Sequence, residues 1–225
     1  MLPEDPYELF DAGKFNDTPI LIGFNSDEGA WFVPLVWSAA TPEAFDTRVR
    51  DIFGPAAESV LQVYLHATPT EIYKSSSEIL RDWAMAWPTC AWAKLQSRKG
   101  RHPAFVYYFD HRPASTSEGA IHAAELAYVF RNLGALPGAP SPPLPEDVAL
   151  SDLMSSYWVN FARSGNPNGS GLPVWHAFDE KGMKTLVVDQ APSARPLPNV
   201  EKLKAFDGYY TWQREQGKTA MSGHH

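Results

Sequence analysis

The stretch that decides the fold runs from Thr18 to Gly29 and reads TPILIGF followed by NSDEG. Thr18 to Phe24 is a short, mostly apolar run rich in isoleucine, which is typical of a strand buried on both faces of a parallel sheet. The polar residues that follow it come at the carboxyl end of the predicted strand, where open α/β sheets place ligands and catalytic groups. The segment therefore predicts a sheet protein with a candidate site at Asp27 and Glu28.

Helical patterns fill the chain between this strand and the next one. Thr41 and Pro42 form a good helix start, because threonine caps the first turn and proline is favoured in it, and Gly54 ends that helix. Two further helices are expected before Gly100. The apolar residues at helical spacing in the three helices are Phe45, Val49 and Ile52, then Val60, Val63 and Tyr64, then Ile79, Trp83, Trp87 and Cys90 toward Leu95.

Two more strands and a long helix complete the pattern. Ala104 to Phe109, AFVYYF, and Thr185 to Asp189, TLVVD, have the aromatic and β-branched residues that strands favour. Between them, Leu153, Tyr157 and Phe161 repeat every fourth residue, with Ser151 as the expected cap and Gly165 as the stop. Strands that alternate with helices indicate an α/β domain. Three strands are few for a complete doubly wound sheet, so we expect part of the domain to lie outside this chain.

Composition excludes several classes of function. The hydrophobic content of 44% supports a packed core, and the net charge of −7 without a basic cluster argues against nucleic acid as a partner. No apolar stretch approaches the roughly 18 residues of a membrane span, the N-terminus lacks the pattern of a signal peptide, and nothing assigns a compartment. Cys90 is the only cysteine, which excludes an intrachain disulfide and a cysteine-rich metal site, and we expect it to be a buried small apolar residue.

The candidate chemistry is a carboxylate paired with a histidine. A carboxylate at Glu28 could accept a hydrogen bond from an imidazole Nδ1–H and stabilise the imidazolium that forms when the ring removes a proton. His122 lies in a loop after the second predicted strand, so the same sheet edge could present both residues. The alternatives remain open at this point: Asp27 and Glu28 as solvated turn residues with Gly29 at positive φ, and His122 as one of seven histidines with no catalytic role.

Several blocks of the sequence resemble the family of type-B carboxylesterases, which includes cholinesterases and bacterial nitrobenzyl esterases. The resemblance covers the chain from about Pro3 to Trp212, and the two blocks with the candidate pair are specific. The matching blocks are PEDPYELFDAGKF (Pro3 to Phe15), PILIGFNSDEGAWF (Pro19 to Phe32), EGAIHAAELAYVF (Glu118 to Phe130) and WVNFARSGNPN (Trp158 to Asn168), with Trp175 after them.

The resemblance implies an α/β-hydrolase fold, with residues 1–225 as the C-terminal portion of one domain: the C-terminal part of the sheet with inserted helices. It places the triad acid on Glu28, the base on His122 and a buried supporting carboxylate on Glu125. Trp31 and Phe32 would line the substrate pocket, although an aromatic pair after a strand is as often part of the core. The implied chemistry requires no metal and no organic cofactor.

One element of the family pattern does not occur in this sequence. The family's nucleophilic serine stands in Gly-x-Ser-x-Gly, preceded by a glycine-rich loop whose N–H groups stabilise the oxyanion. No glycine of these 225 residues is followed two places later by serine. The resemblance thus implies a carboxylic ester hydrolase with a Ser-His-Glu triad, acting on a small-molecule ester, whose serine comes from an N-terminal portion on a separate or cleaved chain.

Two rival functions are compatible with the same fold. A non-catalytic, cholinesterase-like interaction module would use the fold as a binding surface. An inactive fragment would have no catalytic activity. Retention of both Glu28 and His122 favours an enzyme, because a binding module has no chemical need for that pair. A third alternative, a lyase or another hydrolase, would use the two residues alone as acid and base.

Overall fold

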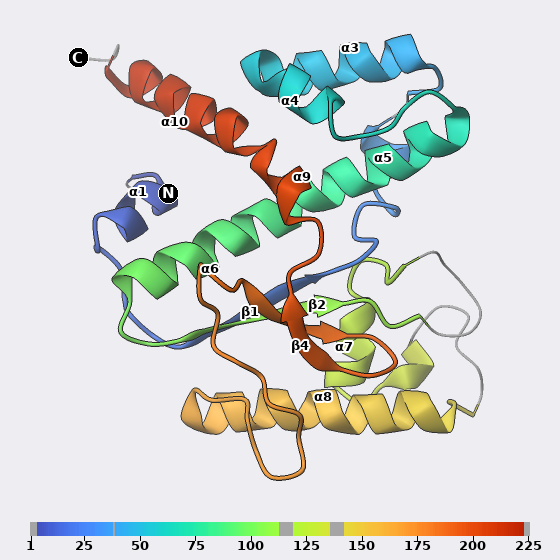
Figure 1. Ribbon diagram of the computed structural model, residues 1–225, viewed down its shortest axis with the longest axis vertical. Helices are drawn as coiled ribbons and strands as arrows, with labels where there is room; N and C mark the ends of the chain where they lie inside the picture. Colours follow the sequence, from blue (N-terminus) through green and yellow to red (C-terminus); the bar gives the residue numbers. More distant parts are fainter. Residues whose placement is uncertain (1–3, 38, 113–118, 136–141, 223–225) are drawn as a thin grey trace.

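The computed structural model describes residues 4–37, 39–112, 119–135 and 142–222 and contains one four-stranded sheet. The strand order is β1-β2-β3-β4, with β1 to β3 parallel and β4 antiparallel to β3. Figure 1 shows the sheet in the middle of the molecule, with helices on both faces. The strands are β1 (Ile20–Asn25), β2 (Ala104–Phe109), β3 (Lys184–Val188) and β4 (Ser193–Pro196). The predicted α/β class is confirmed.

The strands follow from the sequence with small shifts in their ends. All six residues of β2 are buried, as expected for a central strand of aromatic and β-branched residues. β1 begins two residues later than expected and is half-buried over its first four residues, because it pairs only with β2 within the described part of the chain. β4 was not predicted: its sequence, SARP, lacks strand-forming residues, and it is held by pairing with β3.

The helices are of very different lengths and most of them lie between β1 and β2. The α5 helix, a π-helical turn (η2) and the α6 helix form one continuous rod that ends at Gly100 as expected. It contains the third predicted helix but begins at Pro69, ten residues before Ile79, the first residue expected in it. The helices are α1 (Pro6–Asp11), α2 (Val33–Val36), α3 (Pro42–Phe53), η1 (Gly54–Ala56), α4 (Ala57–Leu61), α5 (Pro69–Arg81), η2 (Asp82–Ala86), α6 (Trp87–Lys99), α7 (Ala124–Val129), η3 (Leu133–Ala135), α8 (Pro145–Ser164), α9 (Val200–Lys204) and α10 (Asp207–Ser222).

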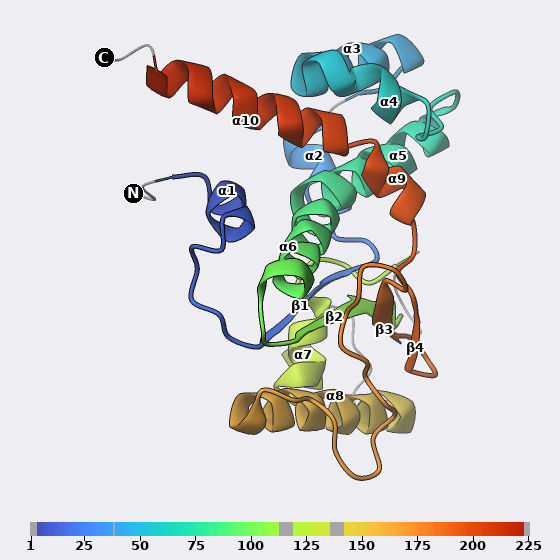
Figure 2. The same ribbon diagram turned by 60° about the vertical axis from the view of Figure 1, so that its left-hand side comes forward.

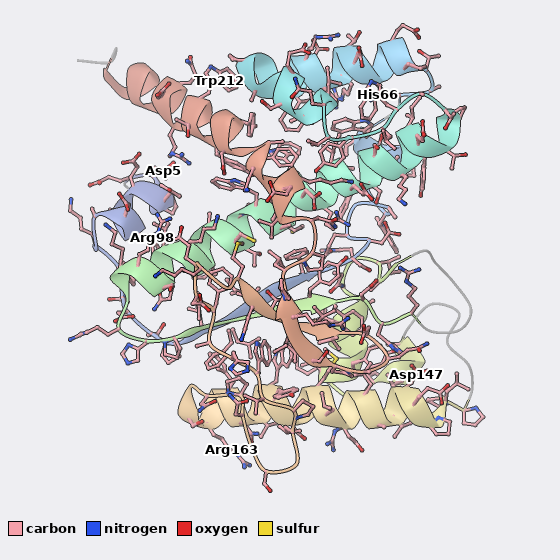
Figure 3. All side chains as sticks on the ribbon, viewed as in Figure 1. Asp5, His66, Arg98, Asp147, Arg163 and Trp212 are labelled. Carbon is pink, nitrogen blue, oxygen red and sulfur yellow. The ribbon has the colours of Figure 1, made fainter. Side chains whose placement is uncertain are left out.

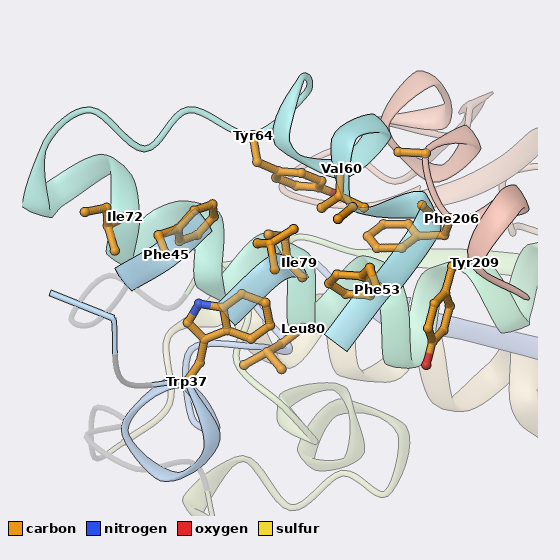
Figure 4. Close-up of a cluster of buried hydrophobic side chains, with 14 of the residues drawn as sticks. Trp37, Phe45, Phe53, Val60, Tyr64, Ile72, Ile79, Leu80, Phe206 and Tyr209 are labelled. Atoms are coloured by element: carbon orange, nitrogen blue, oxygen red, sulfur yellow. The ribbon is translucent and has the colours of Figure 1, made fainter. Parts of the chain in front are cut away.

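The elements form four layers. α7 and α8 cover one face of the sheet and α6 covers the other, in both Figure 1 and Figure 2. A further helical layer of α3, α4 and α10 packs on the outer side of the α5–α6 rod. This outer layer has its own core of aromatic and aliphatic side chains, among them Trp37, Phe45, Phe53, Tyr64 and Phe206 (Figure 4). The α5–α6 rod is thus fixed between two cores.

The start of α8 differs from the prediction. Ser151 does not cap this helix, because the helix begins six residues earlier at Pro145, and proline is well suited to the first turn. The Ser151 hydroxyl is buried and donates to the Tyr128 carbonyl. Asp147, at the start of α8 (Figure 3), accepts hydrogen bonds from His111 Nε2 (2.6 Å) and the Tyr128 hydroxyl (2.9 Å). These buried bonds anchor the first turn of α8 to the end of β2 and to α7.

Two smaller predictions have clear outcomes. Gly165 ends α8 as predicted, in the left-handed conformation (φ 73°). The second predicted helix is shorter than expected: α4 ends at Leu61, so Val63 and Tyr64 lie beyond it. Cys90 is buried, and burial raises the pKa of its thiol to about 12. No helix within the described ranges has the length and apolar character needed to cross a membrane. Pro3 and Glu118, at the ends of two matching blocks, lie outside the described residues.

Candidate active site

The turn after β1 is built tightly against helix α5. Arg81 Nη1 donates to the Ser26 carbonyl (2.8 Å), and the Ser77 hydroxyl donates to Asp27 Oδ1 (2.7 Å). Gly29 does not have positive φ; it is required because a Cβ atom there would lie 1.9 Å from the Ser77 carbonyl oxygen. The turn is therefore fixed from one side by α5, and Glu28 is buried within it.

The loop that carries His122 runs beside this turn. β1 and β2 are parallel neighbours, so the segments after them leave the sheet at the same edge. The Asp27 N–H donates to the Ala120 carbonyl, the Ala120 N–H donates to Ser26 Oγ, and Asp27 and Ile121 form an isolated parallel bridge. This short extension of the sheet places the histidine loop alongside the turn of Glu28.

Glu28 and His122 meet at this edge. The Nδ1 atom of His122 lies 2.5 Å from Glu28 Oε2, and the Glu28 side chain is 8% exposed whereas that of His122 is 43% exposed. An ionised carboxylate can only accept, so Nδ1 carries the proton and Nε2 remains for a partner on the exposed side. The structure thus brings together two residues that are 94 positions apart in the sequence.

The environment of Glu28 has opposing effects on its ionisation. Burial raises the pKa of the Glu28 carboxyl above its ordinary value, and this is the largest effect. The hydrogen bonds from His122 and from the Asn25 backbone N–H act in the other direction, and both favour the ionised form. A carboxylate that is buried but directly hydrogen-bonded to an imidazole can orient the ring and stabilise its protonated form.

Glu125 contacts the pair only indirectly. It is half-buried rather than fully buried, because it lies in the first turn of α7, close to the surface. Its Oε2 atom accepts a hydrogen bond from Asn25 Nδ2 (2.5 Å), and its Oε1 atom accepts one from the Tyr107 hydroxyl (3.4 Å). Tyr107 belongs to no motif and could not be singled out from the sequence. The position of Asn25 as the last residue of β1, next to Glu28, is the signal that could have found it.

The two aromatic residues after Glu28 have different surroundings. Phe32 packs against the outer helical core and its ring lies 5.2 Å from the His122 ring, edge to face. Trp31 is 59% exposed, so it is not a core residue. Both lie within a few positions of Glu28, and only Phe32 contacts the histidine.

A cavity of about 880 Å³ lies on the α5 side of the turn, lined in part by Ser26, Asp27, Ser77 and Arg81, and its lining includes neither Glu28 nor His122. Among the residues that the structure describes, no three His, Cys, Asp or Glu side chains are grouped in a way that could hold a metal ion. Glu28 and His122 lie in segments that follow two adjacent parallel strands, and helices cover both faces of the sheet, as in an α/β-hydrolase fold.

The chain belongs to the carboxylesterase family, because the model of that family matches residues 1–206. A para-nitrobenzyl esterase from Bacillus subtilis (strain 168) is 30% identical over 204 residues, which are 89% of this chain and 40% of that protein. A cocaine esterase from Oryctolagus cuniculus is 31% identical over 198 residues, which are 79% of this chain and 36% of that protein.

Solved structures show the same relationship. A structure of a PNB esterase superposes with a TM-score of 0.73 at 29% sequence identity and covers 91% of this chain and 41% of its own. A second one, described as a thermophylic PNB esterase, has a TM-score of 0.75. The chain therefore spans about two fifths of the length of the relatives that it matches.

Proposed function

We propose that this chain is the C-terminal portion of one carboxylic ester hydrolase domain, with Glu28 as the acid and His122 as the base of a Ser-His-Glu triad. The observation that carries the proposal is the 2.5 Å contact between His122 Nδ1 and buried Glu28, with an exposed His122 ring. Membership of the carboxylesterase family supports the same chemistry. The substrate is a small-molecule ester, and Trp31 and Phe32 are proposed to line its pocket.

The reaction proceeds in two acyl-transfer steps. His122 Nε2 accepts the proton of a serine hydroxyl while the serine oxygen attacks the ester carbonyl, and Glu28 stabilises the imidazolium that forms. The tetrahedral intermediate expels the alcohol, which takes the proton from His122 Nε2 and leaves an acyl-serine. Water then attacks the acyl group while His122 Nε2 takes its proton, and the second tetrahedral intermediate expels the serine oxygen, which takes that proton back from His122 and leaves the carboxylic acid and the free serine.

The serine is proposed to come from a companion polypeptide. No Gly-x-Ser-x-Gly occurs in these 225 residues, and the relatives that the chain matches extend well beyond the matched part. The companion would supply the serine and the N–H donors for the oxyanion. Without it, the chain lacks the nucleophile, and we expect the chain alone to be essentially inactive.

The test is a substitution in the protein reconstituted with its companion. Glu28→Gln removes the charge that stabilises the imidazolium, and a comparable change of a triad carboxylate lowers kcat by about 10⁴-fold. Glu180→Gln is the matched control, since Glu180 is exposed and pairs with Arg98 on the outside of α6. Steady-state hydrolysis of a chromogenic ester measures both. Retention of activity by E28Q to within about tenfold of the control would exclude Glu28 as the triad acid.

A further inference from the structure

Asn25 makes hydrogen bonds to three parts of the candidate site. It is the last residue of β1, it is fully buried, and its backbone N–H donates to Glu28 Oε1 (2.9 Å). Its side-chain Nδ2 donates to the Ile121 carbonyl (2.9 Å), next to His122, and to Glu125 Oε2 (2.5 Å). One residue thus holds the acid, the backbone beside the base and the second carboxylate.

The orientation of the amide is defined by its partners. Nδ2 faces two oxygen atoms, neither of which can donate, so a flipped amide would place Oδ1 against two acceptors. Oδ1 itself is buried and accepts no hydrogen bond from the described residues. A buried acceptor without a hydrogen-bond partner costs free energy. The two hydrogen bonds that Nδ2 donates are therefore formed at the expense of Oδ1.

The two carboxylates explain why a neutral donor is needed. Glu28 and Glu125 are close enough that the charge of Glu125 adds to the effect of burial in raising the pKa of Glu28. N–H donors favour the ionised forms without introducing a positive charge. A lysine or arginine at this position would attract Glu28 and compete with His122 for it, whereas an amide leaves Glu28 Oε2 to the imidazole.

We propose that Asn25 is a positioning residue whose side-chain amide ties the histidine loop to the turn of Glu28 and so holds His122 Nδ1 on Glu28. This inference rests on the proposed roles of Glu28 and His122. Asn25 contacts neither the substrate nor the reacting atoms; it acts through the Ile121 carbonyl and through Glu125. Its loss removes one of the bonds that hold the histidine loop to the turn of Glu28 and leaves Glu125 without its shortest hydrogen bond.

The experiment follows His122 itself in the full chain by NMR with ¹⁵N-labelled histidine. Asn25→Leu keeps the approximate shape and removes both side-chain donors. We expect the Nδ1–H resonance of His122 to weaken or move upfield, because the hydrogen bond between Nδ1 and Glu28 Oε2 loosens when the loop loses this support. In a reconstituted active protein, kcat should fall by about 10²-fold with KM near the unsubstituted value.

Gln96 offers a matched control at the opposite end of the sheet. It is also a buried amide, and its Nε2 donates to Asp17 Oδ1 and to the carbonyls of Thr18 and His102. Gln96→Leu should lose stability as N25L does, but the His122 resonances should remain unchanged. If N25L also leaves the Nδ1–H resonance of His122 unchanged, Asn25 has a structural role only and the proposal is overturned.

A second variant decides the question if N25L does not fold. Asn25→Asp has nearly the same shape, and its carboxyl group can donate to Glu125 only while protonated. The His122 resonances should match those of the unsubstituted chain at acidic pH and depart from them as pH rises. Identical His122 signals at every pH would contradict the proposal. These measurements do not need esterase activity, so a reconstituted protein that fails to hydrolyse esters would overturn the proposed function and leave the role of Asn25 separately testable.

Discussion

At the scale of single residues, Ala123 has the most unusual backbone of the candidate site. It directly follows His122, and it adopts the left-handed conformation (φ 65°, ψ 7°) at the N-terminal cap of α7. A residue with a Cβ atom is strained there by about 1–2 kcal/mol, whereas glycine is not. The strained residue directly follows His122, the proposed base. Strained backbone conformations are often found at functional sites.

Ala123→Gly should therefore stabilise the chain by about 1 kcal/mol, as measured by the urea midpoint at constant m-value. The control is Ala124→Gly in the first turn of α7, where the left-handed argument does not apply and glycine should destabilise by about 0.5–1 kcal/mol or more. If both variants lose stability to the same extent, the conformation of Ala123 is not strained.

The strand pattern predicted that Glu28 and His122 could share a sheet edge, but it left six other histidines and a solvated turn as alternatives, and the family resemblance singled out this pair. The sequence did not predict Asn25 or Ala123, because their roles depend on three-dimensional contacts: a side-chain amide that reaches residues about 100 positions away and a backbone angle. The position of Asn25 at the end of a predicted strand marks it as a candidate, but the sequence alone does not show which groups its side chain contacts.

At the scale of elements, Asp17 connects the segments that precede strands β1 and β2. It lies just before β1 and accepts hydrogen bonds from Gln96 Nε2 at the end of α6 and from the backbone N–H groups of Arg101 and His102, just before β2. The Arg101 N–H makes the largest contribution in lowering the pKa of Asp17 to about 2, and the Gln96 amide adds to it. The carboxylate thus fixes the amino ends of β1 and β2 relative to each other.

The sign of the pH effect follows from this lowered value. Because the pKa of Asp17 is lower in the folded state than in the unfolded chain, its stabilising contribution is present above about pH 4 and is lost as pH falls toward about 2. Asp17→Asn should be less stable than the unsubstituted chain at pH 7, and the difference should shrink over that window. Denaturant melts at pH 7, 4 and near 2 measure it, and a difference that is the same at all three would contradict this role.

Elements differed in how well they could be predicted. The α5–α6 rod and β2 have long or strongly apolar patterns, and both were found. The short β4 strand exists through its pairing with β3, and α8 begins at Pro145, six residues before the expected cap, with buried contacts of Asp147 in its first turn. α1, α9 and α10 were not predicted either; α1 and α9 have only six and five residues, too short for a clear helical period.

At the scale of the whole molecule, the sheet is asymmetric. β4 closes one end as an antiparallel strand, while β1 pairs only with β2 in the part of the chain that the structure describes and is half-buried over most of its length. Leu35 and Phe130, which flank the candidate site in sequence, are 71% and 73% exposed. An apolar strand at a sheet edge and exposed apolar side chains are typical of surfaces that associate with other polypeptide. They are compatible with a companion that carries the serine.

The most direct test of the central claim uses a serine-reactive fluorophosphonate on the purified functional preparation, followed by intact-mass and gel analysis. The account predicts a second polypeptide that takes the label at one serine, and labelling that is abolished or slowed by orders of magnitude when His122→Ala chain replaces the unsubstituted chain. Unchanged labelling with the H122A chain, or ester hydrolysis by the chain alone without any labelled companion, would contradict the claim that this chain supplies the acid and base of a serine esterase.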